Sequence, residues 1–172
     1  MFENTIAPTA NGLSATERSQ GLRTILYAGL IAGAMDITAA LINSKLHGGA
    51  AVRVLQSIAG GLLGRDAYQG GWKTAALGFV LHFCIATIWA AIYYAASLKL
   101  PLLTRQAVWC GLVYGVVVYL AMYSIVLPLS ALRLPVLVQA PAAMLAGILI
   151  HLCCIGLPIA LVTRWQSRKV NR

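Results

Sequence analysis

Residues 24–44 read TILYAGLIAGAMDITAALINS, an apolar stretch in which Asp36 is the one charged side chain. About 20 apolar residues are enough for a helix to cross the hydrocarbon of a bilayer, so this stretch predicts a transmembrane helix. A carboxylate near the centre of such a helix costs roughly 2.5–3.5 kcal/mol on insertion scales. Asp36 therefore needs a partner or a function inside the membrane.

Three further stretches have the same apolar character. Residues 74–98, 106–132 and 134–163 contain no Asp, Glu, Lys or Arg. The chain of 172 residues is 60% hydrophobic and 10% charged, with a mean hydropathy of +0.81, whereas a soluble domain carries about 25% charged residues. Strands of a membrane barrel would alternate in polarity, and these stretches are apolar on every face. The sequence therefore predicts an all-α, polytopic membrane protein built as a four-helix transmembrane bundle.

The chain is predicted to form one membrane domain over residues 23–163, with helices at about 23–44, 73–98, 106–128 and 138–163. Residues 1–22 are expected to form a polar cytoplasmic tail without a signal-peptide pattern, and residues 164–172 a basic cytoplasmic tail. In the first external loop, residues 50–64 carry an apolar stripe at helical spacing, formed by Ala51, Leu55, Ile58 and Leu62. This segment is expected to be an amphipathic helix at the membrane interface, with a re-entrant segment as the alternative.

The distribution of basic residues predicts the orientation. With both termini on one side, that side holds eight Lys and Arg residues near the helix ends and the other side holds five. The positive-inside rule then places both termini in the cytoplasm, and the protein in a bacterial inner membrane. The net charge of +9 does not predict a nucleic-acid partner, because the basic residues flank apolar stretches instead of forming a stripe.

A weak internal repeat relates the two halves of the chain. The motif Gly29-Leu-Ile-Ala-Gly33 recurs as Gly111-Leu-Val-Tyr-Gly115, and the motif His82-Phe-Cys84 recurs as His151-Leu-Cys153. The spacing between the two glycine motifs is longer than that between the two histidine motifs by about the length of the amphipathic segment. This pattern suggests two helical hairpins in the same orientation, a duplication seen in some transporters.

Four polar residues lie on stripes of small residues that mark helix–helix contacts. Small residues at a spacing of three or four let helix backbones approach, so the polar residue of each stripe is expected to face the bundle interior. The predicted packing glycines are Gly29, Gly33, Gly111, Gly115 and Gly147, and the polar residues on the same stripes are Asp36, His82, Tyr119 and His151.

The depths of these four residues are similar. At about 1.5 Å per residue, each lies roughly 12–15 Å from the external end of its helix, so the four side chains could meet in the outer half of the membrane. Carboxyl, imidazole and phenol groups inside a bundle are typical of proton relays and ligand sites. The alternative is a structural one, in which Asp36 and His82 hydrogen-bond and hold two helices together.

Other candidate sites are weaker. Four polar residues of the first external loop, Arg53, Gln56, Arg65 and Asp66, flank the external mouth of the predicted cluster and could gate it or bind an anionic headgroup. Metal-ligand residue types are present, but the spacing of His82 and Cys84 places them on different helix faces, so no metal site and no cofactor are predicted. Catalytic and nucleotide-binding motifs are absent from the sequence.

Residues 23–132 resemble a family of small, uncharacterised bacterial four-helix inner-membrane proteins. The segments that carry the resemblance are AGLIAGAMDITAALI, VRVLQSIAGGLLG, GGWKTAALGFVLHF and GLVYGVVVYLAMYSIVLPLS. The chain is also loosely similar to the YagU-like inner-membrane proteins. That resemblance implies the four-helix architecture and a role in the envelope or in acid tolerance.

Two functions fit these features. The first is a small transport or proton-linked membrane protein with Asp36 and His82 at its polar core. The second is a non-catalytic structural or accessory subunit of a larger membrane complex, or an envelope-stress protein. The small-residue stripes also make a homodimer plausible. An enzyme acting on a lipid or a quinone is a more remote alternative.

Overall fold

The computed structural model describes residues 15–136 and 140–170, and these two ranges are helical and contain no strand. The first half of the chain forms α1 (Ala15–Leu46), α2 (Ala51–Leu63), the 3₁₀ segment η1 (Gly64–Gln69) and α3 (Gly71–Lys99). The second half forms α4 (Leu102–Arg105), α5 (Ala107–Ala121), η2 (Met122–Val126), α6 (Leu127–Leu129), α7 (Pro141–Ile150), η3 (His151–Gly156) and α8 (Leu157–Val170). The segments α5, η2 and α6 follow one another as one α5–α6 helix, and α7, η3 and α8 as one α7–α8 helix.

Four of these helices are long and apolar enough to cross a membrane: Arg18–Leu46, Gly71–Lys99, Ala107–Leu129 and Pro141–Arg168. Large apolar side chains such as Val113 and Ile88 are exposed on the outside of the bundle, where they can contact the hydrocarbon chains of lipids. The prediction of an all-α, four-helix transmembrane bundle is therefore confirmed, and the chain is a multi-pass membrane protein.

The helices extend beyond the boundaries expected from hydropathy. Residues 15–22, predicted as part of a polar tail, belong to α1, and residues 164–170, predicted as a basic tail, continue α8. Hydropathy marks the hydrocarbon limit, while residues with good helix propensity such as Arg18, Gln20 and Gln166 let the helix continue past it. The rest of the N-terminal tail (1–14), the expected start of the last helix (138–139) and residues 171–172 lie outside the described residues.

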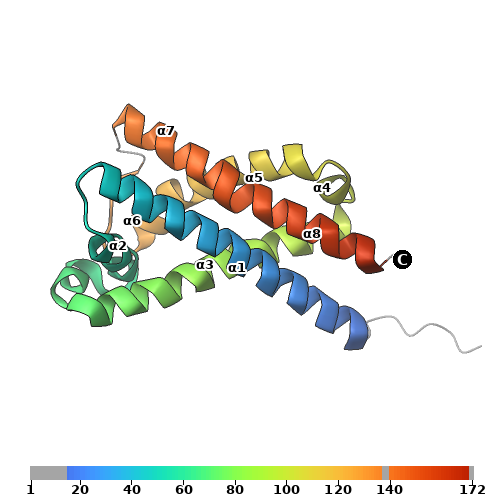
Figure 1. The fold of residues 1–172 in the computed structure, drawn as a ribbon, viewed down its shortest axis with the longest axis horizontal. Coiled ribbons are helices and arrows are strands. Elements are labelled where there is room, and N and C mark those ends of the chain that lie inside the picture. Colours follow the sequence, from blue (N-terminus) through green and yellow to red (C-terminus); the bar gives the residue numbers. More distant parts are fainter. Residues whose placement is uncertain (1–14, 137–139, 171–172) are drawn as a thin grey trace, which may run out of the picture.

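The long helices run side by side, with α2 at one end of the bundle and α4 at the other (Figure 1). These are called the α2 end and the α4 end below. Helix α1 packs against both α3 and the α7–α8 helix, and the α7–α8 helix also packs against α5. The backbones of α3 and α5 stay farther apart and are joined mainly by aromatic side chains. Helix α1 therefore touches elements of both halves of the chain.

The predicted repeat extends to the packing of the helices. In the first hairpin, Gly29 lies against Thr87 and Gly33 against Phe83. In the second hairpin, Gly111 lies against Gly156 and Gly115 against Leu152. The spacings of the glycine and histidine motifs in the sequence map each contact of the first hairpin onto its counterpart in the second. The two hairpins therefore pack in the same register, and these glycine stripes are occupied within one chain.

Two π-helical stretches distinguish the second hairpin from the first. Each ends two residues before a proline: η2 ends at Val126 before Pro128, and η3 ends at Gly156 before Pro158. A proline lacks the N–H of an α-helical bond and its ring crowds the carbonyl four residues earlier, so the preceding turn widens. In both stretches the closing N–H bonds a carbonyl five residues back, from Leu127 to Met122 and from Leu157 to Leu152.

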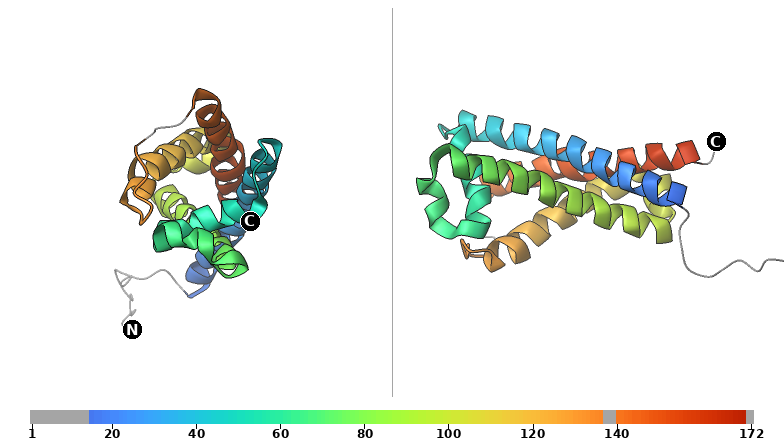
Figure 2. Two further views of the ribbon diagram at one scale, coloured as in Figure 1. Left: turned by 90° about the vertical axis from the view of Figure 1, so that its left-hand side faces the viewer. Right: turned by 90° about the horizontal axis from the view of Figure 1, so that it is seen from below.

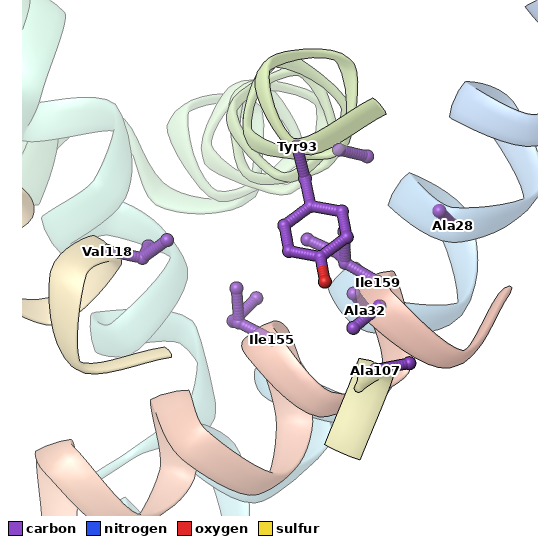
Figure 3. Close-up of a cluster of buried hydrophobic side chains, with 9 residues drawn as sticks. Ala28, Ala32, Tyr93, Ala107, Val118, Ile155 and Ile159 are labelled. Carbon is purple, nitrogen blue, oxygen red and sulfur yellow. The ribbon is translucent and has the colours of Figure 1, made fainter. Parts of the chain in front are cut away.

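The apolar core occupies the half of the bundle toward the α4 end. Tyr93 is 1% exposed and points from α3 toward Ile155 and Ile159 of the α7–α8 helix (Figure 3). Its hydroxyl donates to the Leu103 carbonyl at 2.9 Å, and the Tyr114 hydroxyl of α5 donates to the Trp89 carbonyl of α3 at 2.7 Å. These phenols satisfy their polar ends internally and close this half of the bundle.

Helix α2 lies across its end of the bundle, crosswise to the long helices (Figure 2). Its protein-facing side consists of Gln56, Ala59 and Gly60, whereas Leu62 of the predicted apolar stripe is 63% exposed. The approach to α3 is so close that a side chain on Gly78 would collide with the Leu55 carbonyl. Ala51 and Leu62 of the predicted stripe are exposed and Leu55 and Ile58 are half-buried, so the small and polar side of α2 is the one that packs on the protein.

Gln56 is therefore a structural tie and does not line an external mouth. It is 3% exposed, and its side-chain amide donates to the Gly71 carbonyl at 3.1 Å, next to Thr74 Oγ1 at 3.5 Å. The other three residues of the predicted mouth, Arg53, Arg65 and Asp66, are exposed. Arg53 lies over the Tyr68 ring, with its guanidinium carbon 5.5 Å from the ring centroid.

Replacing Gln56 with Leu is expected to destabilise the docking of α2. The substitution removes the hydrogen bond that the Gln56 amide donates to the Gly71 carbonyl, and a hydrogen bond of this kind contributes about 0.5–1.5 kcal/mol to stability. Denaturant titration in detergent micelles measures this loss. The matched control is Gln69→Leu, which changes an exposed glutamine of η1 and should leave the midpoint unchanged. Equal midpoints for the two variants would contradict the assignment of Gln56.

Candidate functional site

Asp36 lies on α1 about 15 Å from the end of that helix at Leu46, at 1.5 Å per residue, and so within the depth of the membrane. Its side chain is 14% exposed. Small residues surround it on α1, with Ala32 and Gly33 before it and Ala39 and Ala40 after it. This composition leaves room for groups from the neighbouring helices to approach the carboxylate.

His82 of α3 is the nearest basic group to Asp36. Its Nε2 lies 3.9 Å from Asp36 Oδ2, which is an ion-pair distance but too long for a hydrogen bond. The same Nε2 lies 2.9 Å from the carbonyl oxygen of Gly33, one turn before Asp36 on α1. The hydrogen bond that ties α3 to α1 at this level therefore runs from His82 to the backbone of Gly33.

His151, the first residue of η3, approaches Asp36 from the second hairpin. Both His151 and His82 lie close enough to interact electrostatically with the Asp36 carboxylate. The ring of His151 also packs edge-on against Tyr119 of α5, with centroids 5.4 Å apart, and against Tyr123 of η2 at 6.5 Å. The side chain therefore lies between the carboxylate on α1 and an aromatic wall on the α5–α6 helix.

The two histidines have equivalent positions in the two hairpins, but the carboxylate is present in only one of them. The offset that maps Gly33 onto Gly115 maps Asp36 onto Val118, which is buried. One carboxylate is therefore shared by two imidazoles. The asymmetry matters because a second acid at Val118 would add another buried charge without adding a base.

The backbone contacts of the two imidazoles limit their tautomers. His151 Nδ1 lies 2.8 Å from the Gly147 carbonyl, and His82 Nε2 lies 2.9 Å from the Gly33 carbonyl. A carbonyl only accepts, so each of these ring nitrogens carries a proton. In a neutral ring the other nitrogen then keeps its lone pair, which leaves His82 Nδ1 and His151 Nε2 as proton acceptors.

The Asp36 carboxylate is poorly bonded for a structural residue. Within residues 15–136 and 140–170, its Oδ1 is buried and has no hydrogen-bond partner, and His82 is 3.9 Å from Oδ2. A carboxylate that served to hold two helices together would be hydrogen-bonded, because an unpaired buried charge is costly. The helix-holding interpretation of Asp36 is therefore weakened, and that role falls to the bond between His82 and Gly33.

The structure brings three of the four predicted residues directly together and connects the fourth through His151. Tyr119 is 1% exposed and packs its ring on Gly147, one of the predicted packing glycines. The predicted cluster did not include Tyr123, whose ring also packs against His151. The signal in the sequence is Pro128, because a proline can widen the preceding turn into a π-helical stretch, and such stretches often mark functional sites.

The cysteines do not complete a metal site in the described residues. Cys84 and Cys153 are exposed on the lipid-facing surface, and Cys154 is half-buried near Asp36. No group of three His, Cys, Asp or Glu side chains is arranged to hold an ion within the ranges that the structure covers.

The fold and the site together define a class: a multi-pass helical membrane protein with a carboxylate–imidazole centre buried between two similar hairpins. No family model, curated protein or solved structure matches the chain. The function is therefore inferred from the chemistry of this carboxylate–imidazole centre.

Proposed function

We propose that the chain is a small proton-linked transport protein of a bacterial inner membrane, in which Asp36, His82 and His151 hold the transported proton. The proposal rests on the location and hydrogen bonding of the Asp36 carboxylate. It lies inside the membrane beside two imidazoles, and within the described residues its Oδ1 has no hydrogen-bond partner. Intramembrane acids in such surroundings are typical of proton relays in pumps and transporters.

The site can bind and release a proton without separating charge over a long distance. A proton that reaches the site can bind to the carboxylate, to His82 Nδ1 or to His151 Nε2. If it binds to an imidazole, the resulting cation faces the Asp36 anion across the ion-pair distance that already exists at His82. If it binds to the carboxylate, all three groups are neutral, which suits a low-dielectric site.

The two ends of the bundle support movement of the proton in steps. The half toward the α4 end is closed by the core around Tyr93, Ile155 and Ile159. In the proposed mechanism a proton reaches Asp36 from the α2 end, and its release on the other side requires the Tyr93 core to open. Two hairpins packed in the same register provide the units for such a motion, as repeat units do in other transporters.

The orientation follows from the basic residues. The α4 end and the termini carry the larger share of Lys and Arg, among them Arg18, Arg23, Lys99 and Arg105. The positive-inside rule places this end in the cytoplasm and α2 on the opposite side. The polar centre is then nearer to the external surface. The resemblance to YagU-like proteins, with its implied role in the envelope or in acid tolerance, agrees with a protein that handles protons.

Reconstitution tests this function directly. Liposomes containing the purified chain and a pH-sensitive dye are given a pH gradient and a potassium diffusion potential set by valinomycin. Internal pH should change several times faster than in protein-free liposomes, and the rate should depend on the sign of the potential. A rate equal to that of protein-free liposomes would exclude proton transport by the chain alone.

A groove on the surface of the bundle favours a second candidate function, that of an accessory subunit. The groove has a volume of about 460 Å³ and lies between α1 and η3, lined by Ala34, Met35, Thr38, Ala39, Ile42 and Cys154. Small residues on a lipid-facing surface let another helix approach closely, so the groove suits a helix of a second copy or of a larger complex. Ala34→Leu should then abolish co-purification of a stoichiometric partner from native membranes, and recovery of the chain alone in wild-type preparations would contradict this function.

A further inference from the structure

A second groove lies on the opposite flank of the bundle, where α3 and α5 face each other near the α4 end. Its volume is about 290 Å³, and its walls come from Tyr93 and Ala96 of α3, Leu103 of α4, and Trp109, Cys110, Val113, Tyr114 and Val117 of α5. Along α5 the groove extends over two turns of helix, about 12 Å at 1.5 Å per residue. It exists because the α3 and α5 backbones do not approach closely, and aromatic side chains span the distance between them.

The tyrosine hydroxyls and the thiol in the groove walls are directed to carbonyl groups of the protein. The Tyr93 hydroxyl donates to the Leu103 carbonyl, and the Tyr114 hydroxyl donates to the Trp89 carbonyl. The Cys110 thiol points to the Leu102 carbonyl, with the sulfur 3.7 Å from the oxygen. A ligand between α3 and α5 therefore gains mainly apolar contact, which suits a hydrocarbon chain, and the exposed indole N–H of Trp109 is available to a polar headgroup.

Positive charge is placed at the α4 end of the groove. Lys99 ends α3 one turn after Ala96, and Arg105 ends α4 two residues after Leu103, so both cations lie near the α4 end of the groove without lining its walls. Both side chains are exposed, and residues 99–106 contain no Asp or Glu to neutralise them. Trp109 is 71% exposed at the start of α5, a position at which indole rings lie at the level of lipid headgroups.

We propose that this groove binds an anionic glycerophospholipid, with one acyl chain between α3 and α5 and the phosphate between Lys99 and Arg105. The assignment rests on the apolar walls, which select the chain, and on the two cations at one end, which select the charge of the headgroup. A helix of a second copy fits less well because the bulky, exposed Trp109 and Val113 occupy the rim, where a close helix contact needs small residues. The proposal does not depend on proton transport.

Native mass spectrometry of the delipidated protein in detergent tests the proposal. The probes are phosphatidylglycerol and phosphatidylcholine with identical acyl chains, and glycerol phosphate without a chain. We expect the first phosphatidylglycerol molecule to bind at least fivefold more tightly than phosphatidylcholine, with no binding of glycerol phosphate. Equal affinities for the two lipids would overturn the role of the cations, and binding of glycerol phosphate would overturn the role of the chain.

Two variants locate the site. Val113→Trp fills the groove and should reduce phosphatidylglycerol binding at least fivefold, while Val80→Trp, at an exposed position of α3 outside the groove, should leave it unchanged. Arg105→Gln should lower the preference for phosphatidylglycerol over phosphatidylcholine roughly fivefold, because one interfacial cation is removed. Undiminished binding by Val113→Trp would refute the site, and loss of a dimer in that variant would assign the groove to a second copy instead. A thermal melt of each variant in the same detergent confirms that it is folded.

Discussion

Asp36→Asn is expected to reduce proton flux to the level of protein-free liposomes while the protein remains folded. Asparagine has nearly the same shape as aspartate, but it cannot take up or release a proton at physiological pH. His82 and His151 would retain their bonds to the Gly33 and Gly147 carbonyls. The bundle then keeps its structure and loses the one acid that the two imidazoles share. The measurement is the dye-reported rate under a fixed diffusion potential.

The chain provides a matched control for this substitution. Asp66 is the other aspartate of the sequence and lies exposed in η1, so Asp66→Asn should transport as fast as the wild type. Infrared difference spectroscopy gives a second readout, because Asp36→Asn should remove the contribution of the buried carboxyl from the pH-dependent carboxyl band, whereas Asp66→Asn should keep that contribution. Normal flux in Asp36→Asn would remove the carboxylate from the mechanism.

The stability of the same variant separates function from a structural role. Removal of a charge that lacks hydrogen bonds should leave the midpoint of unfolding unchanged or raise it, since an Asp at the membrane centre costs roughly 2.5–3.5 kcal/mol on insertion scales. If Asp36 instead holds the helices together, Asp36→Asn should lower the midpoint of unfolding. Any loss of flux should then follow from the loss of folded protein. Reduced stability with unchanged flux would support the structural role alone.

Gly156→Ala is expected to destabilise the bundle strongly. A Cβ at this position would collide with the Gly111 carbonyl oxygen and with the Gly115 backbone, 2.7 Å from its Cα. Backbone atoms cannot rotate away as the end of a side chain can, so the α7–α8 helix must move off α5. Overpacking of this kind typically costs 1–3 kcal/mol, and we expect a value of about 3 kcal/mol because the Cβ meets backbone atoms of two successive turns of α5.

A second glycine of a helix provides the comparison. A Cβ on Gly61 of α2 would meet its nearest neighbour, Ser130 Cβ, at 3.9 Å, which is an ordinary contact. Gly61→Ala should therefore be neutral or slightly stabilising, because alanine is favoured over glycine in a helix by up to about 1 kcal/mol. Circular dichroism during unfolding in mixed micelles measures the midpoints of the two variants and tests this difference. Similar midpoints for the two variants would contradict the prediction, because they would show that α5 and the α7–α8 helix can move apart at Gly156 at little cost.

The architecture could be predicted from the sequence because lipid imposes a simple rule. Backbone groups in hydrocarbon must bond within the segment, so each long apolar stretch had to be a helix. The small-residue stripes indicated which faces meet, and the spacing of the repeated motifs predicted the hairpin register that Gly29 and Gly111 show. The ends of the helices were less predictable, since α1 and α8 continue into water where hydropathy no longer reports them.

Hydropathy also could not reveal which side of α2 packs on the protein. The apolar stripe with Leu55 and Leu62 predicted an amphipathic helix at the membrane interface, and Gln56 was assigned to the external mouth of the cluster. Gln56 is buried instead, because its amide finds the Gly71 carbonyl at the end of the loop. Whether a polar side chain finds a partner depends on backbone positions that sequence periodicity does not contain.

The sequence by itself determined that this is a four-helix membrane protein with an acid and two histidines facing its interior, because burial in lipid and the spacing of small residues leave few alternatives. Only the tertiary structure decided how those groups are used. It placed His82 on the Gly33 carbonyl at 2.9 Å, left Asp36 Oδ1 buried without a partner in the described residues, and brought His151 from the other hairpin to the same carboxylate. The physical reason is that hydrogen bonds are sensitive to differences of less than about 1 Å, and those differences are set by helix packing and by the π-helical turns before the prolines.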